Sequence, residues 1–274
     1  MLHIIVCIKM VPDTTQVKID PVTNTLVRDG IPFITNPFDT PAIEEALKIK
    51  DKHGAKVTIL SMGPPTADAV IRKAIAMGAD EGILVSDRVF GGADTLATSK
   101  VLAHAISELS KTHTVDLVLC GRQTIDGDTA QVGPGIATRL GFSQITLVDK
   151  VISVDTVGKK IVVRRKTDEW HEIVETKWPA LITVEREANT PRYPSTPRRL
   201  YAEDVDIPVW NNYFFRMDPE TIGLKGSPTY VKRIFAPEAR KGEIFTGNEE
   251  NPQGMANVIM KKLAEWKVIN VDQR

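Results

Sequence analysis

The residues with the most evident capacity for chemistry lie in a polar, glycine-containing segment from Cys120 to Gly133. It follows an apolar run, Val115–Cys120, and leads into a helix expected over Thr129–Leu140. Ligands of open parallel sheets bind where strands end, and the amides at a helix N-terminus attract phosphate. The segment therefore predicts a phosphate-bearing ligand, with Asp128 expected to cap the following helix. A capped loop with no ligand is the alternative interpretation.

Two further polar loops are expected at the same edge of the sheet. Residues 85–95 contain Gly91 and Gly92, whose bare backbone would admit a ring or a phosphate, and end on Asp94 or Thr95 as a helix cap. Residues 36–39, with the sequence NPFD, stand before another helix. A capped turn explains each loop alone. Together the three loops predict a cleft of nucleotide size.

Common catalytic and cofactor motifs are missing from the sequence. The GPGIAT sequence at residues 133–138 lacks the third glycine of the dinucleotide fingerprint and has no strand directly before it. No phosphate-binding GxxxxGK[ST] sequence, Ser-His-Asp signature or HExxH motif occurs. Cys7 and Cys120 have no metal-ligand spacing, and the histidines lie far apart in sequence. We therefore assign no catalytic residue and no metal site, and interpret both cysteines as small buried hydrophobic residues.

Composition limits the class of protein. The chain has 274 residues, with 35 Lys and Arg against 35 Asp and Glu, so its net charge is zero. Proteins that bind nucleic acid or acidic lipid normally carry a basic surplus, so neither kind of partner is expected. No apolar stretch reaches the roughly 18 residues of a membrane span, and no secretory signal is evident. A cytoplasmic protein is predicted.

The first 141 residues alternate apolar runs with helical patterns, which predicts βαβ units and a parallel sheet. The expected fold is α/β: a Rossmann-like open parallel sheet with helices on both faces, antiparallel edge strands and an extended C-terminal arm. A small hairpin is expected from Val17–Ile19 and Thr25–Val27, and Asp39 is expected to cap the first helix. The other expected elements are strands Leu2–Ile8, Val57–Leu60, Gly82–Val85 and Val115–Cys120, and helices from Asp39 to Gly54, Pro64 to Gly78, Thr95 to Leu109 and Thr129 to Leu140.

The pattern changes after Gly141. Four strand-like runs with no helix between them are expected to add antiparallel strands to one edge of the sheet: Ile145–Val154, Ile161–Lys166, Ile173–Thr176 and Ala180–Val184. Residues 189–237 contain seven prolines and little periodicity, which favours an arm lying on another chain. A last helix is expected over Gln253–Trp266. The predicted domains are therefore 1–188, which would bind the nucleotide, and 189–274, the arm and terminal helix.

Several motifs in combination resemble the beta subunit of electron transfer flavoprotein. They are NPFD at residues 36–39, the loop at 126–133 and ANTPRY at 188–193, joined by VCIKMVPD at 6–13 and AMGAD at 76–80. The resemblance runs from Leu2 to about Leu200. It implies a heterodimer with an alpha subunit that carries FAD.

The loop at residues 126–133 is most similar to that of the electron-bifurcating group, which holds two FAD. It reads DGDTAQVG, so Gly127 and Ala130 replace larger polar residues of the type that binds structural AMP. The stretch GGADTLATS at residues 91–99 and, more loosely, residues 222–229 also resemble the bifurcating group. The resemblance implies a second FAD in this chain, reduced by NADH. The residues it implies at that cofactor are Cys7, Asn36, Pro37, Phe38, Asp39, Met62, Gly91, Gly92, Asp94, Thr95, Thr98, Gly121, Gln123, Asp126, Gly127, Asp128, Thr129, Ala130, Gln131, Val132 and Gly133.

The resemblance also implies further partners. Electrons would pass by way of the alpha-subunit FAD to a ferredoxin or flavodoxin and to an acyl-CoA dehydrogenase-like or quinone-linked flavoprotein. Thr196 stands where the mitochondrial type has a leucine that docks dehydrogenases, so that anchor does not carry over. Two alternatives stay open. One is a non-bifurcating subunit with structural AMP that passes electrons between dehydrogenases and the respiratory chain, and the other is a free-standing nucleotide sensor.

Overall fold

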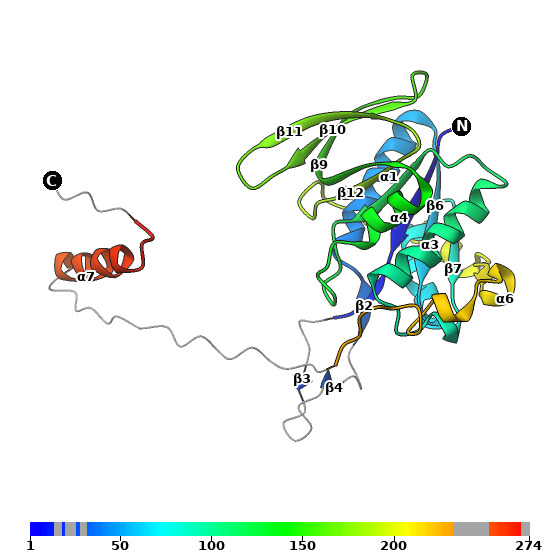
Figure 1. The fold of residues 1–274 in the computed structure, drawn as a ribbon. Helices are drawn as coiled ribbons and strands as arrows, with labels where there is room; N and C mark the ends of the chain where they lie inside the picture. The colour runs from blue at the N-terminus through cyan, green and yellow to red at the C-terminus, as the bar shows by residue number, and fades with distance from the viewer. Residues whose placement is uncertain (14–17, 20–25, 28–31, 233–251, 270–274) are drawn as a thin grey trace. The chain divides into compact units, whose positions relative to one another are not determined.

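The computed structural model describes residues 1–13, 18–19, 26–27, 32–232 and 252–269 (Figure 1). Residues 1–234 form one compact unit and residues 235–274 a second, and each is described by itself. The first unit holds the elements that position the candidate site.

Nine strands of the described chain form one sheet in the order β11-β10-β9-β12-β8-β1-β6-β7-β13. Seven of them, from β9 to β13 in this order, run parallel to one another, while β10 is antiparallel to both β9 and β11. The fold is thus α/β with antiparallel edge strands, as predicted. The strands are β1 His3–Ile8, β6 Lys56–Met62, β7 Glu81–Val85, β8 Leu117–Gly121, β9 Ser143–Asp155, β10 Lys160–Lys166, β11 His171–Lys177, β12 Ala180–Val184 and β13 Val209–Trp210.

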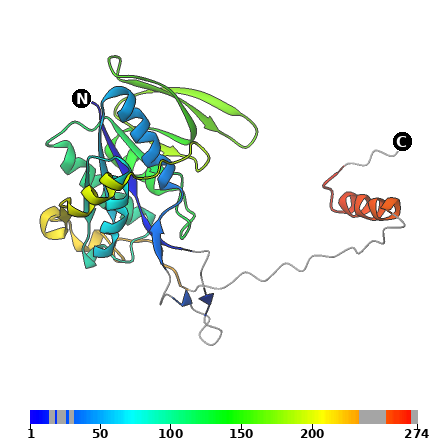
Figure 2. The ribbon, with the colours of Figure 1, turned by 180° about the vertical axis from the view of Figure 1, so that it is seen from behind.

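Helices cover both faces of this sheet. Successive side chains of a strand point to opposite faces. On β1, Ile4 and Val6 accordingly join the hydrophobic layer under α1 (Asp39–His53) and α2 (Asp68–Met77), the face seen in Figure 2. Ile5 and Cys7 join the opposite layer under α3 (Thr95–Ser110) and α4 (Val132–Leu140), seen in Figure 1. The central strands are buried on both sides, so a ligand can reach them only at their ends.

Short elements connect these layers. β2 (Met10–Pro12) pairs with β5 (Phe33–Thr35), and 3-10 turns η2 (Pro65–Ala67) and η3 (Arg88–Phe90) precede α2 and α3. The expected hairpin exists as β3 (Lys18–Ile19) paired antiparallel with β4 (Leu26–Val27). Its turn and the outer residues Val17 and Thr25 lie outside the described residues.

One expected strand direction is wrong. We expected Ala180–Val184 to be an antiparallel strand at the sheet edge, but β12 lies inside the sheet, parallel to both β8 and β9. All five of its residues are buried, as is usual for a parallel strand covered on both faces. The short connection from β11 misled the prediction, because a turn between strands normally indicates antiparallel pairing.

The expectation of an irregular segment after residue 188 is also wrong within the described residues. This part forms α5 (Thr196–Asp204), β13, α6 (Asn212–Phe215) and η4 (Pro219–Thr221). Arg72 of α2 donates to the carbonyl oxygens of Ala202, Glu203 and Val205, and β13 pairs with β7. Prolines 197 and 219 stand in the first turns of α5 and η4, where proline begins a helix instead of breaking it. Whether the segment also contacts another chain stays a prediction.

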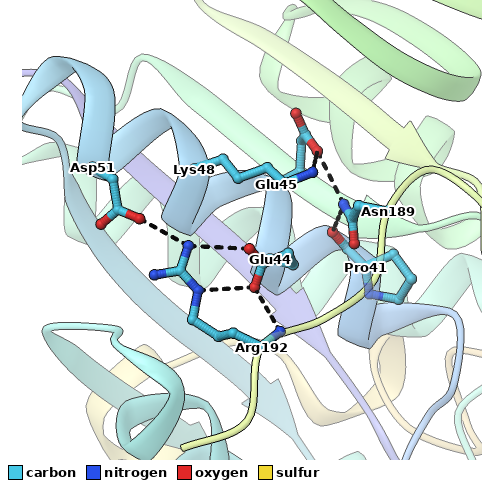
Figure 3. Close-up of polar contacts among 7 residues, drawn as sticks. All are labelled: Pro41, Glu44, Glu45, Lys48, Asp51, Asn189 and Arg192. Atoms are coloured by element: carbon cyan, nitrogen blue, oxygen red, sulfur yellow. Dashed lines mark hydrogen bonds and ion pairs between the residues drawn. The ribbon is translucent and has the colours of Figure 1, made fainter.

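A polar clasp joins the start of this segment to α1 (Figure 3). The guanidinium of Arg192 donates to both carboxylate oxygens of Glu44, at 2.9 and 3.0 Å, and to Asp51 at 2.8 Å. The backbone amide of Arg192 also donates to Glu44 at 3.0 Å. Asn189 donates to the carbonyl of Pro41 and to Glu45, each at 3.0 Å. The chain leaving β12 is therefore held on α1 by five hydrogen bonds to acidic side chains and one to the backbone.

The second unit contains α7 (Pro252–Glu265), which agrees with the helix expected over Gln253–Trp266. Its apolar residues Val258, Ile259 and Met260 are exposed. None of the described helices is both long and apolar enough to cross a membrane.

Candidate functional site

A cavity of about 560 Å³ opens at the carboxyl ends of β1, β6 and β8, between the first turns of α3 and α4. This volume falls within the range of sites for small molecules and cofactors. All three expected polar loops border it, although not with every residue. The predicted residues that line it are Cys7, Asp39, Met62, Gly92, Asp94, Thr95, Thr98, Gly121, Gln123, Gly127, Thr129, Ala130, Gln131, Val132 and Gly133.

The wall also contains residues that the list of predicted cofactor residues missed, although Ala93, Cys120, Arg122 and Thr124 lie within the expected polar loops. Most are direct neighbours of predicted residues and could have been found by extending each loop by one or two positions. Thr229 and Val231 could not, because the loose resemblance of residues 222–229 to the bifurcating group did not assign any of them to the ligand. The missed residues are Ile8, Lys9, Phe90, Ala93, Leu102, Cys120, Arg122, Thr124, Thr229 and Val231.

Six predicted residues are not in the cavity wall: Asn36, Pro37, Phe38, Gly91, Asp126 and Asp128. Asn36 instead joins two of the loops from behind. Its side-chain amide donates to the carbonyl of Gln123 at 2.8 Å, and its side-chain oxygen accepts from the amide of Ile125 at 3.3 Å. Because Asn36 is fully buried, it fixes the position of the loop without facing the cavity.

The helix after this loop begins at Val132, three residues later than expected. Asp128 does not cap it, which corrects the prediction: its carboxylate accepts from the side-chain amide of Gln123 at 2.5 Å. Asp128 and Ala130 both have φ of 55°, so the backbone turns twice through the left-handed region before α4. Among the described residues no side chain caps the first turn of α4. The amides there are consequently available to an anion at the cavity wall.

At α3 the expected cap is confirmed. The Asp94 carboxylate accepts from the amide of Ala97 at 3.0 Å. The hydroxyl of Thr95 donates to the side chain of Gln131 at 2.8 Å, which joins the N-termini of α3 and α4 across the cavity wall.

Asp39 does not cap α1, contrary to the prediction. The residue before the helix is Phe38, and Asp39 is the first helical residue. Its buried carboxylate accepts from the amide of Lys9 at 2.7 Å and lies against the backbone of Gly121. Burial raises the pKa of Asp39 to about 7, although hydrogen bonds from Lys9, Asn36 and Gly121 oppose this rise. Asp39 thus ties the ends of β1 and β8 together and can change its protonation near neutral pH.

Two cations stand at the cavity, each with a carboxylate beside it. Lys9 pairs with Asp126 at 2.6 Å, and Arg122 pairs with Glu185 at 3.3 Å. Burial acts to raise the pKa of Asp126, but hydrogen bonds from Lys9 and Thr124 bring it below its usual range. Asp126 therefore stays charged at neutral pH and orients Lys9 from outside the wall.

Cys7 and Cys120 are register partners on β1 and β8, and both are buried free thiols. A hydrogen bond with Cys7, together with burial, raises the pKa of Cys120 well above its usual value. A thiol of raised pKa is a poor nucleophile, which agrees with the interpretation of Cys120 as a small buried hydrophobic residue. In the described part of the chain no group of three or more His, Cys, Asp or Glu side chains is placed to hold a metal ion.

Gly92 carries a conformational constraint that predicts the effect of a substitution. Its φ is 70°, and a Cβ atom there would lie 3.2 Å from the Cβ of Leu224. We expect Gly92→Val to lower the free energy of unfolding by about 1–3 kcal/mol, because a β-branched residue is strained in this region. Urea unfolding measures this effect. Gly54→Val is a control for backbone strain alone, since Gly54 has φ of 72° and nothing within 4 Å of a Cβ. Equal losses in the two variants would show that the contact with Leu224 contributes nothing.

Comparison with known proteins shows which family the sequence resembles. The model of the electron transfer flavoprotein domain matches residues 23–211. The chain is 49% identical over 249 residues to the electron transfer flavoprotein subunit beta of Thermoanaerobacterium thermosaccharolyticum, covering 90% of this chain and 93% of that one. It is 46% identical to the caffeyl-CoA reductase-Etf complex subunit CarD of Acetobacterium woodii, covering 98% and 100%. It is 45% identical to protein FixA of Azotobacter vinelandii, covering 96% and 94%.

Proposed function

The chain belongs to the electron transfer flavoprotein family, with beta subunits among its close relatives, and we propose that it binds FAD as the beta subunit of a heterodimer. In this proposal the heterodimer takes electrons from NADH and divides them between a low-potential carrier and a high-potential acceptor. The electrons pass by way of a second FAD on the alpha subunit.

One observation carries the proposal: a single cavity is bordered both by the loop before α4 and by the loop before α3. FAD has a flavin group in addition to its adenosine, so it needs one region of the wall for each part within the same cavity. A cleft limited to one loop would favour a smaller ligand.

The wall suits a flavin nucleotide chemically. The first turn of α4 offers amides to a pyrophosphate, and Gly127, Ala130 and Gly133 leave the backbone open to close approach. Met62, Phe90 and Leu102 supply apolar contacts of the kind that a ring system requires. Lys9 and Arg122 can donate hydrogen bonds to phosphate oxygens, although each is already paired with a carboxylate, Asp126 and Glu185.

We assign the adenosine and pyrophosphate to residues 126–132 and the flavin to residues 91–98, with Asn36, Pro37, Phe38 and the backbone of Cys7 at the adenine. Asn36 would act through the loop that it holds, since it does not line the cavity. The chemistry that bound FAD supplies is acceptance of a hydride from NADH and release of its electrons one at a time. The protein binds and orients the group and keeps water from its buried face.

The alternative within the same family is a subunit with structural AMP, without hydride chemistry. The small size of Gly127 and Ala130 favours FAD. Larger side chains at these positions would leave less room for a flavin beyond the adenosine. For the electron acceptors we propose a ferredoxin or flavodoxin and an acyl-CoA dehydrogenase-like or quinone-linked flavoprotein, and for the cell compartment the cytoplasm. The relative named as part of a caffeyl-CoA reductase-Etf complex supports a multi-subunit setting.

The nucleotide content of the purified heterodimer tests the proposal. The chain would be co-expressed with its alpha subunit, and nucleotides released by denaturation would be separated and counted. We expect two FAD per heterodimer and bleaching of the flavin absorbance when NADH is added. One FAD and one AMP would establish the alternative. An isolated beta chain that is soluble and binds nucleotide equally well without the alpha subunit would favour a free-standing sensor.

A further inference from the structure

One wall of the cavity comes from a segment far away in sequence. Residues 222–231, which we call the strap, follow η4 and bring Thr229 and Val231 to the cavity. The amide of Leu224 in the strap donates to the carbonyl of Gly91 at 3.0 Å. Gly223, with φ of 57°, lies so close to the carbonyl of Val89 that a Cβ atom would stand 1.9 Å from it. The strap therefore packs directly on the loop before α3.

Asp94 is the residue that ties the strap to this loop. One carboxylate oxygen accepts from the amide of Ala97 and thereby caps α3. The other accepts from the amide of Thr229 at 3.1 Å and from its hydroxyl at 2.8 Å. The backbone amide of Asp94 donates to the hydroxyl of Ser227 at 2.8 Å, which in turn donates to the carbonyl of Gly223 at 2.7 Å.

These bonds occupy the Asp94 side chain. Burial acts to raise the pKa of Asp94, but the donors from Ala97, Thr229 and Leu96 hold it below its usual range. The carboxylate is therefore ionised at neutral pH and accepts from groups of its own chain. Because the Asp94 carboxylate already accepts these hydrogen bonds, it is better suited to keeping the strap in place than to accepting hydrogen bonds from a ligand.

We propose that Asp94 is a positioning residue of the nucleotide site, which fastens the strap across the cavity and so slows release of the bound nucleotide. The inference rests on the proposed function only in requiring that the cavity binds a nucleotide. It holds for FAD and for AMP, because Thr229 and Val231 of the strap line the same cavity as the loop at residues 127–132 to which the adenosine is assigned.

Asp94→Asn separates the two tasks of the carboxylate. An asparagine oxygen can still accept from the amide of Ala97, but its NH₂ group cannot accept from Thr229 and meets two donors there. We expect the variant heterodimer to release the nucleotide with which it purifies about tenfold faster or more, since hydrogen bonds to a charged group are lost. Release would be followed by dilution and filtration. The rate of tryptic cleavage after the exposed Lys225 gives a second readout, which should rise in the same variant.

Asp87→Asn is the matched control. One oxygen of Asp87 accepts from the amide of Val89 and the other from the amide of Asn212, so this carboxylate also links the loop to a distant segment. Asp87 does not line the cavity. We expect the control to release nucleotide at the wild-type rate, even if its unfolding temperature falls as much as that of Asp94→Asn.

Thr229 gives a second route to the same bond. Thr229→Val removes the hydroxyl and should accelerate release, whereas Thr229→Ser keeps the hydroxyl and should resemble the wild type. If Thr229 acts through Asp94, the effects of Asp94→Asn and Thr229→Val will not add in the double variant. Additive effects would overturn the assignment, because they would mean that Thr229 holds the nucleotide independently.

The outcomes separate this inference from the function itself. A wild-type heterodimer with no nucleotide in this subunit would overturn both. A wild type loaded with FAD or AMP, together with unchanged release from Asp94→Asn, would overturn the strap alone. Equally fast release from Asp87→Asn would also overturn it, since any loosening of the loop would then suffice.

Discussion

Replacing Arg192 with alanine is expected to lower the free energy of unfolding by about 3 kcal/mol, because it leaves a buried carboxylate without its cation. Only 6% of the Glu44 side chain is exposed. The Arg192 guanidinium donates two hydrogen bonds to this carboxylate and one to Asp51, and the substitution removes all three. The same change would weaken the attachment of residues 189–195, the start of the segment that packs on α2 and pairs with β7, because of the clasp only the bonds from Asn189 and from the backbone amide of residue 192 would remain. We therefore expect the loss of stability to be accompanied by faster proteolysis within this segment.

Urea unfolding of the heterodimer and of the isolated chain measures the effect. Lys48→Ala is the control on the same helix, because Lys48 pairs with Glu45 at 3.5 Å with 47% of its side chain exposed. An exposed pair of this kind contributes about 0–1 kcal/mol. Glu44→Gln and the double variant complete a cycle that isolates the interaction between the two residues. A loss of less than about 1 kcal/mol for Arg192→Ala would show that the clasp does not hold the segment.

Asp39→Asn is expected to change how stability depends on pH. The pKa of Asp39 is about 7 in the folded chain and 3.8 in its ordinary state, so folding favours the protonated carboxyl. The resulting contribution to stability is fully present below pH 3.8 and is lost as the pH rises through 7. A gap of about three pH units corresponds to a free energy on the order of 4 kcal/mol. Asparagine does not titrate, so the variant should gain stability relative to the wild type between pH 4.5 and 8.

Unfolding by urea at several pH values between 4.5 and 8 tests this expectation. Asp126→Asn is the matched control in the same region, because the pKa of Asp126 lies below its usual range. Its contribution is lost only on acidification, so its difference from the wild type should stay constant between pH 5 and 8. If Asp39→Asn and Asp126→Asn follow parallel pH profiles, Asp39 is charged throughout and its burial is compensated by the donors around it.

Most elements up to β8 could be predicted from the sequence because their signals are local, although the short paired strands β2 and β5 were not among them. Apolar runs such as Leu2–Ile8 and the glycine after α1 mark strands and helix ends within a few residues. The direction of β12 could not be predicted in this way. It depends on pairing with β8 and β9, whose partner residues lie 36 to 63 positions earlier in the chain. The proline content after residue 188 led to the wrong expectation of an irregular segment. A proline in the first turn of a helix cannot be told from a proline in an irregular segment by sequence alone.

In the candidate site, too, features with local sequence signals were predicted and features that depend on distant residues were not. The loops before α3 and α4 were predicted from glycines and polar residues close together in sequence, and both border the cavity. The strap was not predicted as part of the site, because its bond to Asp94 joins residues 135 positions apart. The local rule for helix caps succeeded for Asp94 and failed for Asp39 and Asp128, whose carboxylates accept from groups outside the following helix. A helix cap can be proposed from residue type, but the structure is needed to show which other hydrogen-bond donors the same carboxylate can accept from.

The position of β12 has a consequence for the order in which the chain folds during synthesis. β8 and β9 both emerge from the ribosome before β12, yet β12 fills the place between them in the finished sheet. Until residue 184 is available, the parallel sheet ends at β8, and its backbone donors and acceptors form an open edge. Early docking of β9 directly onto β8 would occupy that place and would have to be reversed. Fragments that end before β12 should therefore aggregate through this edge, and completion of the sheet should be the late, slow step of folding.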